Sequence, residues 1–254
     1  MSEPRLAASV ILARAGTDGP ELYMTRRSAA SAFAPDAFVF PGGTIDAQDH
    51  SDAARERALG VEGGFLNGET RLTIAAELPI AALRELFEEA GVLIARTAAG
   101  ASVDAARVDA RDVADARVRV RAGELGFAEF LREREWFADA RALTFFSHWI
   151  TPESEPRRYS AHFFFALAPP DQAGQADRVE THDGIWIAPR RALERYREGR
   201  FHLVYPTIKH LQRLENFADL QSMAQYARSK TIASVLPDET PDGFTLPPEL
   251  ERTW

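Results

Sequence analysis

Short runs of apolar, β-branched and aromatic residues recur along the chain, and turn residues such as Gly-Thr-Asp-Gly-Pro at positions 16–20 separate them. Runs of this kind, bounded by turns, are typical of β-strands. The pattern predicts strands at residues 8–14, 22–26, 37–40, 144–150, 162–168 and 185–187. Proline at the start of each of two later segments predicts helices at residues 189–197 and 206–226.

A further helix is predicted after Pro79, and its two faces differ in chemistry. At about 100° per residue, one stripe of this helix is apolar and the opposite stripe is acidic. Gly91 ends the helix as a C-terminal glycine should, and the apolar residues 92–95 then predict another strand. The apolar stripe consists of Leu83, Leu86, Phe87 and Ala90, and the acidic stripe consists of Glu85, Glu88 and Glu89.

The acidic stripe carries a charge that the helix does not neutralise. Arg84 can pair with Glu88 at i,i+4, but Glu85 and Glu89 form a like-charge pair that costs a few tenths of a kcal/mol. A bound divalent cation would turn this repulsion into attraction, and Mg²⁺ and Mn²⁺ prefer oxygen ligands. The stripe is therefore a candidate metal site, although a bare E-x-x-E-E pattern would more often be an ordinary solvated face.

The residues around the acidic stripe resemble a known motif. The run from Arg84 to Val92 matches R-E-U-x-E-E-x-G-U, the second half of the Nudix box, at every fixed position, where U is an aliphatic residue. Upstream, Phe40-Pro41-Gly42-Gly43 resembles the entry into that box. The chain thus resembles the Nudix hydrolases. This resemblance implies an α/β/α sandwich with a mixed sheet, here with helical insertions, and cleavage of a nucleoside diphosphate linked to another moiety.

The two halves of the motif are unusually far apart. The usual box is G-x5-E-x7-R-E-U-x-E-E-x-G-U, whereas Gly43 and Arg84 are separated by 41 positions. The glutamate expected eight positions before the arginine would fall at Ala76, so either Glu77 substitutes for it or its role is absent. In the family, that glutamate helps to hold the loop and the helix together.

We assign the extra residues to an insertion at residues 44–78, with one short helix. Its ends must lie close to the metal site, because the Nudix motif holds the flanking loop and helix together. We therefore expect the insertion to help choose the substrate rather than to support the core. Its acidic side chains favour a surface loop, since buried carboxylates need partners; they are Asp46, Asp49, Asp52, Glu56, Glu62 and Glu69.

Within the superfamily, the chain resembles most the acyl-coenzyme A diphosphatase branch, whose box carries a long internal insertion. A neighbouring coenzyme A branch has a further arginine and glycine before the Phe-Pro-Gly-Gly sequence, and both are missing here. The closer likeness is carried by residues 25–28, 38–43, 149–152, 156–159 and 205–207.

Hydrolysis of a diphosphate requires cations on the phosphoryl oxygens and a carboxylate that orients or deprotonates the attacking water. The resemblance implies Glu85, Glu88 and Glu89 as ligands of Mg²⁺ or Mn²⁺, and Arg84 as part of the same catalytic motif. In related enzymes one of these glutamates, or a distant one, acts as the base. Glu180 is our candidate for the distant residue; an exposed loop glutamate is the alternative.

Arginines near the motif are candidate phosphate ligands, because the guanidinium group matches phosphate oxygens bidentately. Adjacent strand residues point to opposite faces, so at most one member of each arginine pair should reach the site. The histidines show no metal-binding spacing. The candidate substrate-binding residues are Arg26, Arg27, Gly42, Gly43, Arg157 and Arg158.

Composition narrows the function further. The formal net charge of −8 disfavours a nucleic-acid partner, because lysine and arginine supply the sequence-independent affinity for its backbone. The absence of cysteine excludes a disulfide scaffold, a thiolate zinc site and a cysteine nucleophile. Without a signal-peptide pattern or a run of roughly 18 apolar residues, we expect a cytoplasmic protein that does not enter membranes. The resemblance also implies a homodimer, since Nudix members often dimerise.

We predict a single domain over residues 1–234, with a helical subregion at 104–142 and a C-terminal tail at 235–254. The leading function is metal-dependent hydrolysis of the diphosphate bond in coenzyme A or acyl-coenzyme A, giving a phosphopantetheine product and adenosine 3′,5′-bisphosphate. One alternative is the same chemistry on ADP-ribose, NADH or another nucleoside diphosphate derivative. A second is a non-catalytic domain that senses a nucleotide, although the retained glutamates weigh against it.

Overall fold

A computed structural model describes residues 3–31, 34–62, 64–67, 70–103, 108, 110–172, 174, 181–241, 243–251 and 253–254. The main sheet of this described part consists of β1 (Arg5–Gly16), β2 (Gly19–Arg27), β3 (Phe38–Val39), β4 (Gly42–Thr44), β10 (Thr144–Ile150), β11 (Tyr159–Leu167), β12 (Thr181–Ile187) and β13 (Ser234–Val235). The strand order is β12-β2-β1-β11-β10-β13, with β3 beside β2 and β4 beside β1. The sheet is mixed, because β1 runs parallel to β11 and antiparallel to β2.

The central strand β1 is apolar on both faces. Ala8, Val10 and Leu12 belong to one buried cluster, whereas Ile11 and Ala13 belong to a second cluster on the opposite face. This separation follows from the period-two geometry of a strand. A sheet that is apolar on both faces must be covered on both sides, and helices supply the two covers.

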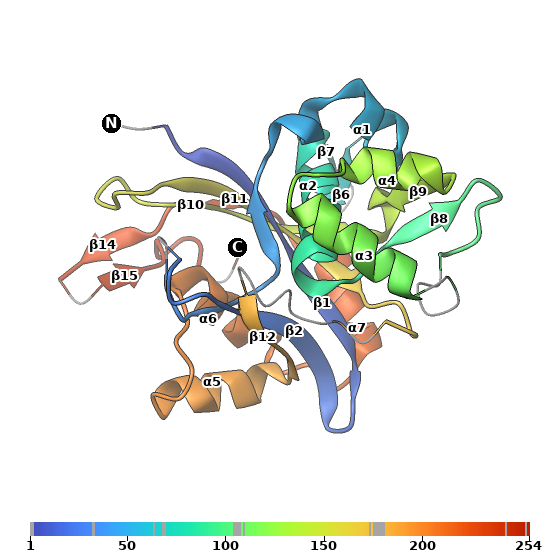
Figure 1. Cartoon of the computed structure of the whole chain (residues 1–254). Helices are drawn as coiled ribbons and strands as arrows, with labels where there is room; N and C mark the ends of the chain where they lie inside the picture. Colours follow the sequence, from blue (N-terminus) through green and yellow to red (C-terminus); the bar gives the residue numbers. More distant parts are fainter. Residues whose placement is uncertain are drawn as a thin grey trace.

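The helices form two layers around the sheet (Figure 1). One layer packs α2 with α1, α3 and α4 into the first cluster, and the other packs α5, α6 and α7 into the second. The predicted α/β/α sandwich with a mixed sheet is therefore confirmed. The helices are α1 (Asp52–Glu56), α2 (Glu77–Ala90), α3 (Ala110–Arg121), α4 (Phe127–Glu133), α5 (Pro189–Arg197), α6 (Tyr205–Leu214) and α7 (Leu220–Ser229), with 3-10 turns η1 (Ala47–His50) and η2 (Ala140–Ala142).

Three predicted elements differ from the structure. The segment 206–226 is two helices, because Asp219 caps the start of α7 by accepting the N–H of Ser222. Near its end, the subregion 104–142 contains the strand β9 (Trp136–Asp139), which pairs with neighbours on both of its sides. The apolar residues 92–94 precede a strand instead of forming it. The small sheet involved contains β5 (Ala58–Leu59), β9 and β8 (Ala95–Thr97), in that order.

The insertion is more structured than expected, and part of it belongs to the core. It contains η1, α1, β5 and a hairpin of β6 (Phe65–Asn67) and β7 (Thr70–Leu72). Ala54, Val61 and Phe65 are buried in the same cluster as α2. The expectation that this segment would not support the core is therefore wrong. A few buried apolar side chains are sufficient to anchor a segment that is otherwise polar.

The segment 235–254 packs onto the rest of the chain through its last residue. Trp254 is 2% exposed, and its ring lies edge-on to Trp149 with centroids 4.9 Å apart. A separate hairpin in this segment is formed by β14 (Asp238–Thr240) and β15 (Gly243–Thr245). The domain boundary at residue 234 stays a prediction. None of the helices in the described ranges has the length and apolar content that crossing a bilayer requires.

We expect Phe87→Ala to lower the free energy of unfolding by about 3–5 kcal/mol, because it removes a large side chain from a closed site. Phe87 is fully buried and stacks on Phe130 with ring centroids 5.1 Å apart. Denaturant titration would measure the loss, with Val118→Ala as a control at a position that is 56% exposed. An unchanged midpoint together with lost substrate affinity would mean that the two faces of α2 have been exchanged.

The stability of the fold should fall as the solution becomes acidic. Burial lowers the pKa of His210 to about 3, and burial together with the neighbouring His148 lowers the pKa of His162 to about 4. In the unfolded chain both groups titrate near about 6.5. The unfolded state therefore binds more protons below that pH, which costs the native state up to about 1.4 kcal/mol per pH unit for each histidine.

Unfolding curves recorded at several pH values between 7 and 4 would test this expectation. His162→Phe should flatten the dependence of stability on pH, because the ring stacks on Phe145 and an apolar ring can replace it. His202→Gln is the matched control, because His202 is exposed. Equal slopes in the parent and in His162→Phe would contradict the role given to His162.

Candidate active site

The helix α2 presents its glutamates to the rest of the chain and not to solvent. The side chains of Glu85 and Glu88 are each 12% exposed, and Glu89 is 5% exposed. The predicted apolar stripe is confirmed, since Leu86 and Phe87 are completely buried on the other side. The acidic stripe is not an ordinary solvated face, because the glycine loop and the start of the insertion cover it.

The glycine loop touches the glutamates directly. The N–H of Gly42 donates to Oε2 of Glu89 at 2.9 Å. A Cβ on Gly43 would stand 2.4 Å from Oε1 of Glu85, and one on Gly42 would collide with the backbone of Ser9. Gly42 thus approaches main-chain atoms that cannot move away, whereas a side chain at position 43 would displace the carboxylate of Glu85. The structure therefore brings the predicted residues of both halves of the motif together.

Arg84 lies at the centre of this group, with its side chain 4% exposed. Its Nη1 donates to Oε1 of Glu85 at 2.9 Å and to Oε1 of Glu88 at 3.2 Å. Its Nε and Nη2 form a two-pronged pair with the carboxylate of Asp49, each at 2.9 Å. Burial opposes the charge, but the hydrogen bond to Asp49 and the surrounding carboxylates raise the pKa of Arg84 above its usual value.

Asp49 occupies the position of the acidic residue in the first half of the Nudix box. It is 1% exposed, and it lies six positions after Gly43, where the box pattern G-x5-E requires its acidic residue. Glu77 instead faces His50 and Arg55, at 3.5 and 3.7 Å. The idea that Glu77 substitutes, or that the role is gone, is therefore wrong. The sequence does reveal this acidic residue when the spacing is counted forward from Gly43 instead of backward from Arg84. The extra residues of the box therefore follow Asp49.

Two of the other predicted arginines, Arg26 and Arg27, lie at the end of β2. Arg26 donates to Asp36 at 2.9 Å and lies 3.6 Å from Asp183, so its charge is already balanced. Arg27 donates to the hydroxyl group of Ser31. Arg26 lies opposite Phe38 of β3, and the N–H of Arg27 donates to the carbonyl of Ala37, just before β3 and the glycine loop. Their role in substrate binding stays a prediction.

Arg157 and Arg158 precede β11 at the end of the sheet where β1 begins. Nε of Arg158 donates to the carbonyl of Thr151, and its own carbonyl accepts the N–H of Arg5. Arg5 in turn donates to the hydroxyl group of Thr44 at 3.3 Å. Arg5 is thus a cation beside the glycine loop that the sequence analysis did not select. Glu180, the candidate for a distant base, lies outside the described residues.

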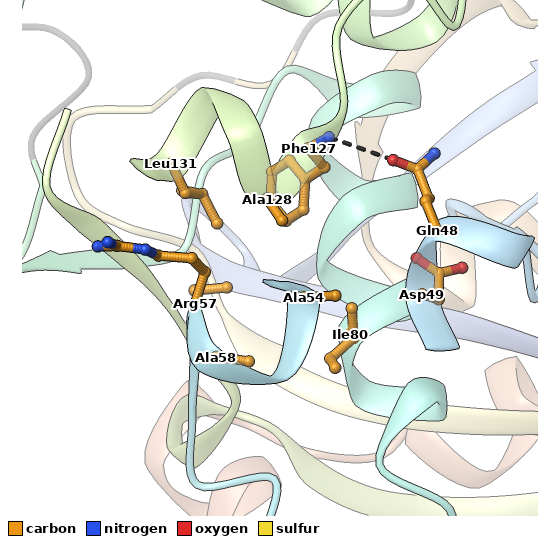
Figure 2. Close-up of a pocket in the computed structure, with 10 residues that line it drawn as sticks. Gln48, Asp49, Ala54, Arg57, Ala58, Ile80, Phe127, Ala128 and Leu131 are labelled. Carbon is orange, nitrogen blue, oxygen red and sulfur yellow. Dashed lines mark hydrogen bonds between the residues drawn. The ribbon is translucent and has the colours of Figure 1, made fainter. Parts of the chain in front are cut away.

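A small cavity of about 10 Å³ lies between α1, α2 and α4, and Asp49 is one of the residues that line it (Figure 2). Figure 2 shows mainly apolar side chains around it, with the amide oxygen of Gln48 accepting the N–H of Phe127 at 3.2 Å. This volume suits about one water molecule and no substrate. The cavity marks the place where the insertion meets α4, and the chemistry is expected on the side of the glycine loop.

The residues present fit a hard divalent cation. In the described part of the chain, the carboxylates of Asp49, Glu85 and Glu88 pair with Arg84, and that of Glu89 accepts from the glycine loop, so carboxylate oxygens gather between this loop and α2. Carboxylate oxygens are the ligands that Mg²⁺ and Mn²⁺ prefer, and Mg²⁺ usually takes only one or two of them from the protein. Within the described ranges no three acidic or histidine side chains already converge as a closed ligand set. The assignment of individual ligands stays a prediction.

A mixed sheet between two helical layers, with a Gly-Gly loop fixed to a glutamate-rich helix, is the arrangement that the Nudix resemblance implies. Residues 68–214 match the family model described as the NUDT19 Nudix domain. The chain is 30% identical to acyl-coenzyme A diphosphatase NUDT19 of Gallus gallus, over 90% of the chain and 72% of that protein. For the protein of the same name from Xenopus laevis, identity is 26% over 85% of the chain and 65% of the relative.

A solved structure agrees with these matches. The crystal structure of a Nudix hydrolase from Alicyclobacillus acidocaldarius has a TM-score of 0.72 and 25% identity, covering 88% of this chain and 97% of that one. The chain therefore belongs to the Nudix hydrolase family and is a Nudix pyrophosphohydrolase. Within the family, its matching domain model is that of NUDT19.

Proposed function

We propose that the chain hydrolyses the diphosphate bond of coenzyme A or acyl-coenzyme A with Mg²⁺ or Mn²⁺. The products would be a phosphopantetheine species and adenosine 3′,5′-bisphosphate. The observation that carries the proposal is the likeness of 90% of the chain to a relative named acyl-coenzyme A diphosphatase. The three buried glutamates of α2, which lie against the glycine loop, support the metal dependence.

The chemistry of the site follows from its charges. A diphosphate repels an attacking water, and a cation held by Glu85, Glu88 and Glu89 would neutralise the phosphoryl oxygens when bound. Arg84 keeps the carboxylates of Glu85 and Glu88 side by side, since both accept from the same nitrogen atom. Glu89 is fixed to the glycine loop. One of these glutamates, or Glu180, would orient or deprotonate the water.

The alternative substrates share this chemistry. ADP-ribose, NADH and other nucleoside diphosphate derivatives contain the same diphosphate bond, and metal coordination by the glutamates does not distinguish them. A domain that only senses a nucleotide does not require several carboxylates buried close together, because burying each charge costs free energy. This cost favours an enzyme over a sensor.

A panel of substrates tests the proposal. Coenzyme A, acetyl-coenzyme A, dephospho-coenzyme A, ADP-ribose and NADH are incubated with Mg²⁺, Mn²⁺ or EDTA, and the products are separated by chromatography. We expect the highest kcat/KM for coenzyme A or its thioester, formation of adenosine 3′,5′-bisphosphate, and no turnover in EDTA. Faster turnover of ADP-ribose or NADH would establish the alternative substrates. Binding without turnover under every condition would establish the sensor.

Three further expectations remain proposals. A cytoplasmic location can be tested by fractionating cells that express the tagged protein. A homodimer, which only the family resemblance favours, can be tested by light scattering of the purified protein. Binding to nucleic acid is not expected, because the net charge of −8 opposes it.

A further inference from the structure

The last turn of α2 leaves backbone carbonyls that the helix cannot satisfy by itself. An α-helix leaves its final four carbonyl groups without an intrahelical partner. At this end, the N–H groups of Gly91 and Val92 bond back to the two carbonyls that precede Glu88. The next two carbonyls are those of Glu88 and Glu89, and these are two of the residues whose carboxylates form the candidate metal site.

One side chain satisfies both of these carbonyls. Nε of Arg117 donates to the carbonyl of Glu88 at 2.9 Å, and Nη2 of the same guanidinium donates to the carbonyl of Glu89 at 2.8 Å. The planar fork of arginine presents two donors at a fixed spacing. A single residue from another helix thus bridges the main chain of two adjacent site residues.

The sequence of α3 places Arg117 at this position. Val113, Ala116 and Val120 form a buried stripe at intervals of three and four residues, which turns one face of α3 toward the core. Arg117 follows this stripe and reaches over the end of α2. A Cβ on Gly91 would stand 2.8 Å from Nη1 of Arg117, and Gly91 has φ 65°. Glycine at this position therefore serves both the end of the helix and the approach of the arginine.

The charge of Arg117 suits this place. A cation near the C-terminus of a helix is favourable, because the helix dipole concentrates partial negative charge there. Its guanidinium also lies on the main chain of two residues whose carboxylates belong to the candidate site. With both carbonyls held, the carboxylates of Glu88 and Glu89 start from a fixed backbone, as a preorganised site requires.

We propose that Arg117 is a positioning residue of the active site, which sets the affinity for the divalent cation by fixing the backbone of Glu88 and Glu89. The inference rests on the proposed metal site and adds a residue that lies 28 positions beyond Glu89 in the sequence. It also gives a function to α3, which belongs to the subregion between the motif and β10.

The test measures Mn²⁺ binding by calorimetry in the parent and three variants. Arg117→Met removes both hydrogen bonds and keeps the length of the stem, whereas Arg117→Lys keeps the charge and a single-point donor. Arg119→Met is the matched control, because Arg119 is an exposed arginine on the same helix. We expect the Kd for Mn²⁺ to rise at least about tenfold in Arg117→Met, corresponding to about 1.4 kcal/mol, to rise less in Arg117→Lys, and to stay unchanged in Arg119→Met.

A second readout separates positioning from general support of the fold. The Mg²⁺ concentration that gives half-maximal hydrolysis should rise in Arg117→Met, whereas the substrate KM at saturating Mg²⁺ should not. If both Arg117 variants melt earlier but bind Mn²⁺ like the parent, the positioning role is overturned. If Arg117→Met does not fold, the positioning role is judged by whether the Kd for Mn²⁺ is higher in Arg117→Lys than in Arg119→Met. A parent that binds no Mn²⁺ overturns the proposed metal site itself.

Discussion

Glu88→Gln and Glu89→Gln should each lower turnover at least about a hundredfold while the protein stays folded. Glutamine keeps the size of glutamate and one side-chain oxygen. The hydrogen bond from Arg84 to residue 88 and that from the N–H of Gly42 to residue 89 can therefore persist. Only the negative charge that would hold the cation is lost.

Turnover and the thermal midpoint should be measured on the same samples, with the midpoint also taken in EDTA. Glu56→Gln is the matched control, because Glu56 is exposed on α1. In EDTA, the midpoint of Glu89→Gln should equal or exceed that of the parent, because repulsion between Glu85 and residue 89 is relieved. Parental turnover in both variants would remove the basis for a metal site on α2.

The faces of α2 could be predicted from the sequence because they depend on local periodicity alone. Helical geometry places Leu86 and Phe87 on one side and the glutamates on the other, whatever the rest of the chain does. What covers the acidic side is a tertiary property. The loop at Gly42 and the segment at Asp49 cover this side, and they precede Glu89 in the sequence by 47 and 40 positions. No local pattern could therefore show that the carboxylates are buried.

The insertion at residues 44–78 shows where prediction from composition fails. Its acidic composition predicted a surface loop, since unpaired carboxylates are rarely buried. The prediction failed at Asp49, because its partner Arg84 lies beyond the insertion. It also failed at Phe65, whose ring lies 5.4 Å from that of Phe164 on β11. A mean composition does not reveal the single residues that anchor a segment.

Boundaries between helices depended on caps that periodicity does not detect. The segment 206–226 keeps a helical pattern throughout, yet the chain leaves the helix after Leu214 and begins a new one at Leu220. The side chain of Asp219 competes for the backbone there, as aspartate at an N-cap does. The position of Arg117 over α2 had no sequence signal, because it depends on how two helices cross.

A large loss of stability is also expected when the buried ion pair between Asp49 and Arg84 is broken. Asp49→Asn should lower the free energy of unfolding by about 1–3 kcal/mol, because it removes one of the charges paired with the buried guanidinium and weakens two charge-assisted hydrogen bonds. Asp49 also accepts the N–H of Asp46 at 2.8 Å, so the turn η1 loses part of its support. Activity should fall as well, since Arg84 would then be shared only between Glu85 and Glu88.

Urea unfolding at constant pH would measure the change in stability, with Asp52→Asn as the matched control because Asp52 is exposed on the same segment. Asp49→Leu, Arg84→Met and the double variant that combines these two changes complete a thermodynamic cycle with the parent. The double variant should lose less stability than the two single changes added together, because an apolar pair can replace a buried ion pair. A loss in Asp49→Asn no larger than in the control would show that Asp49 does not hold the glycine loop and the catalytic helix together.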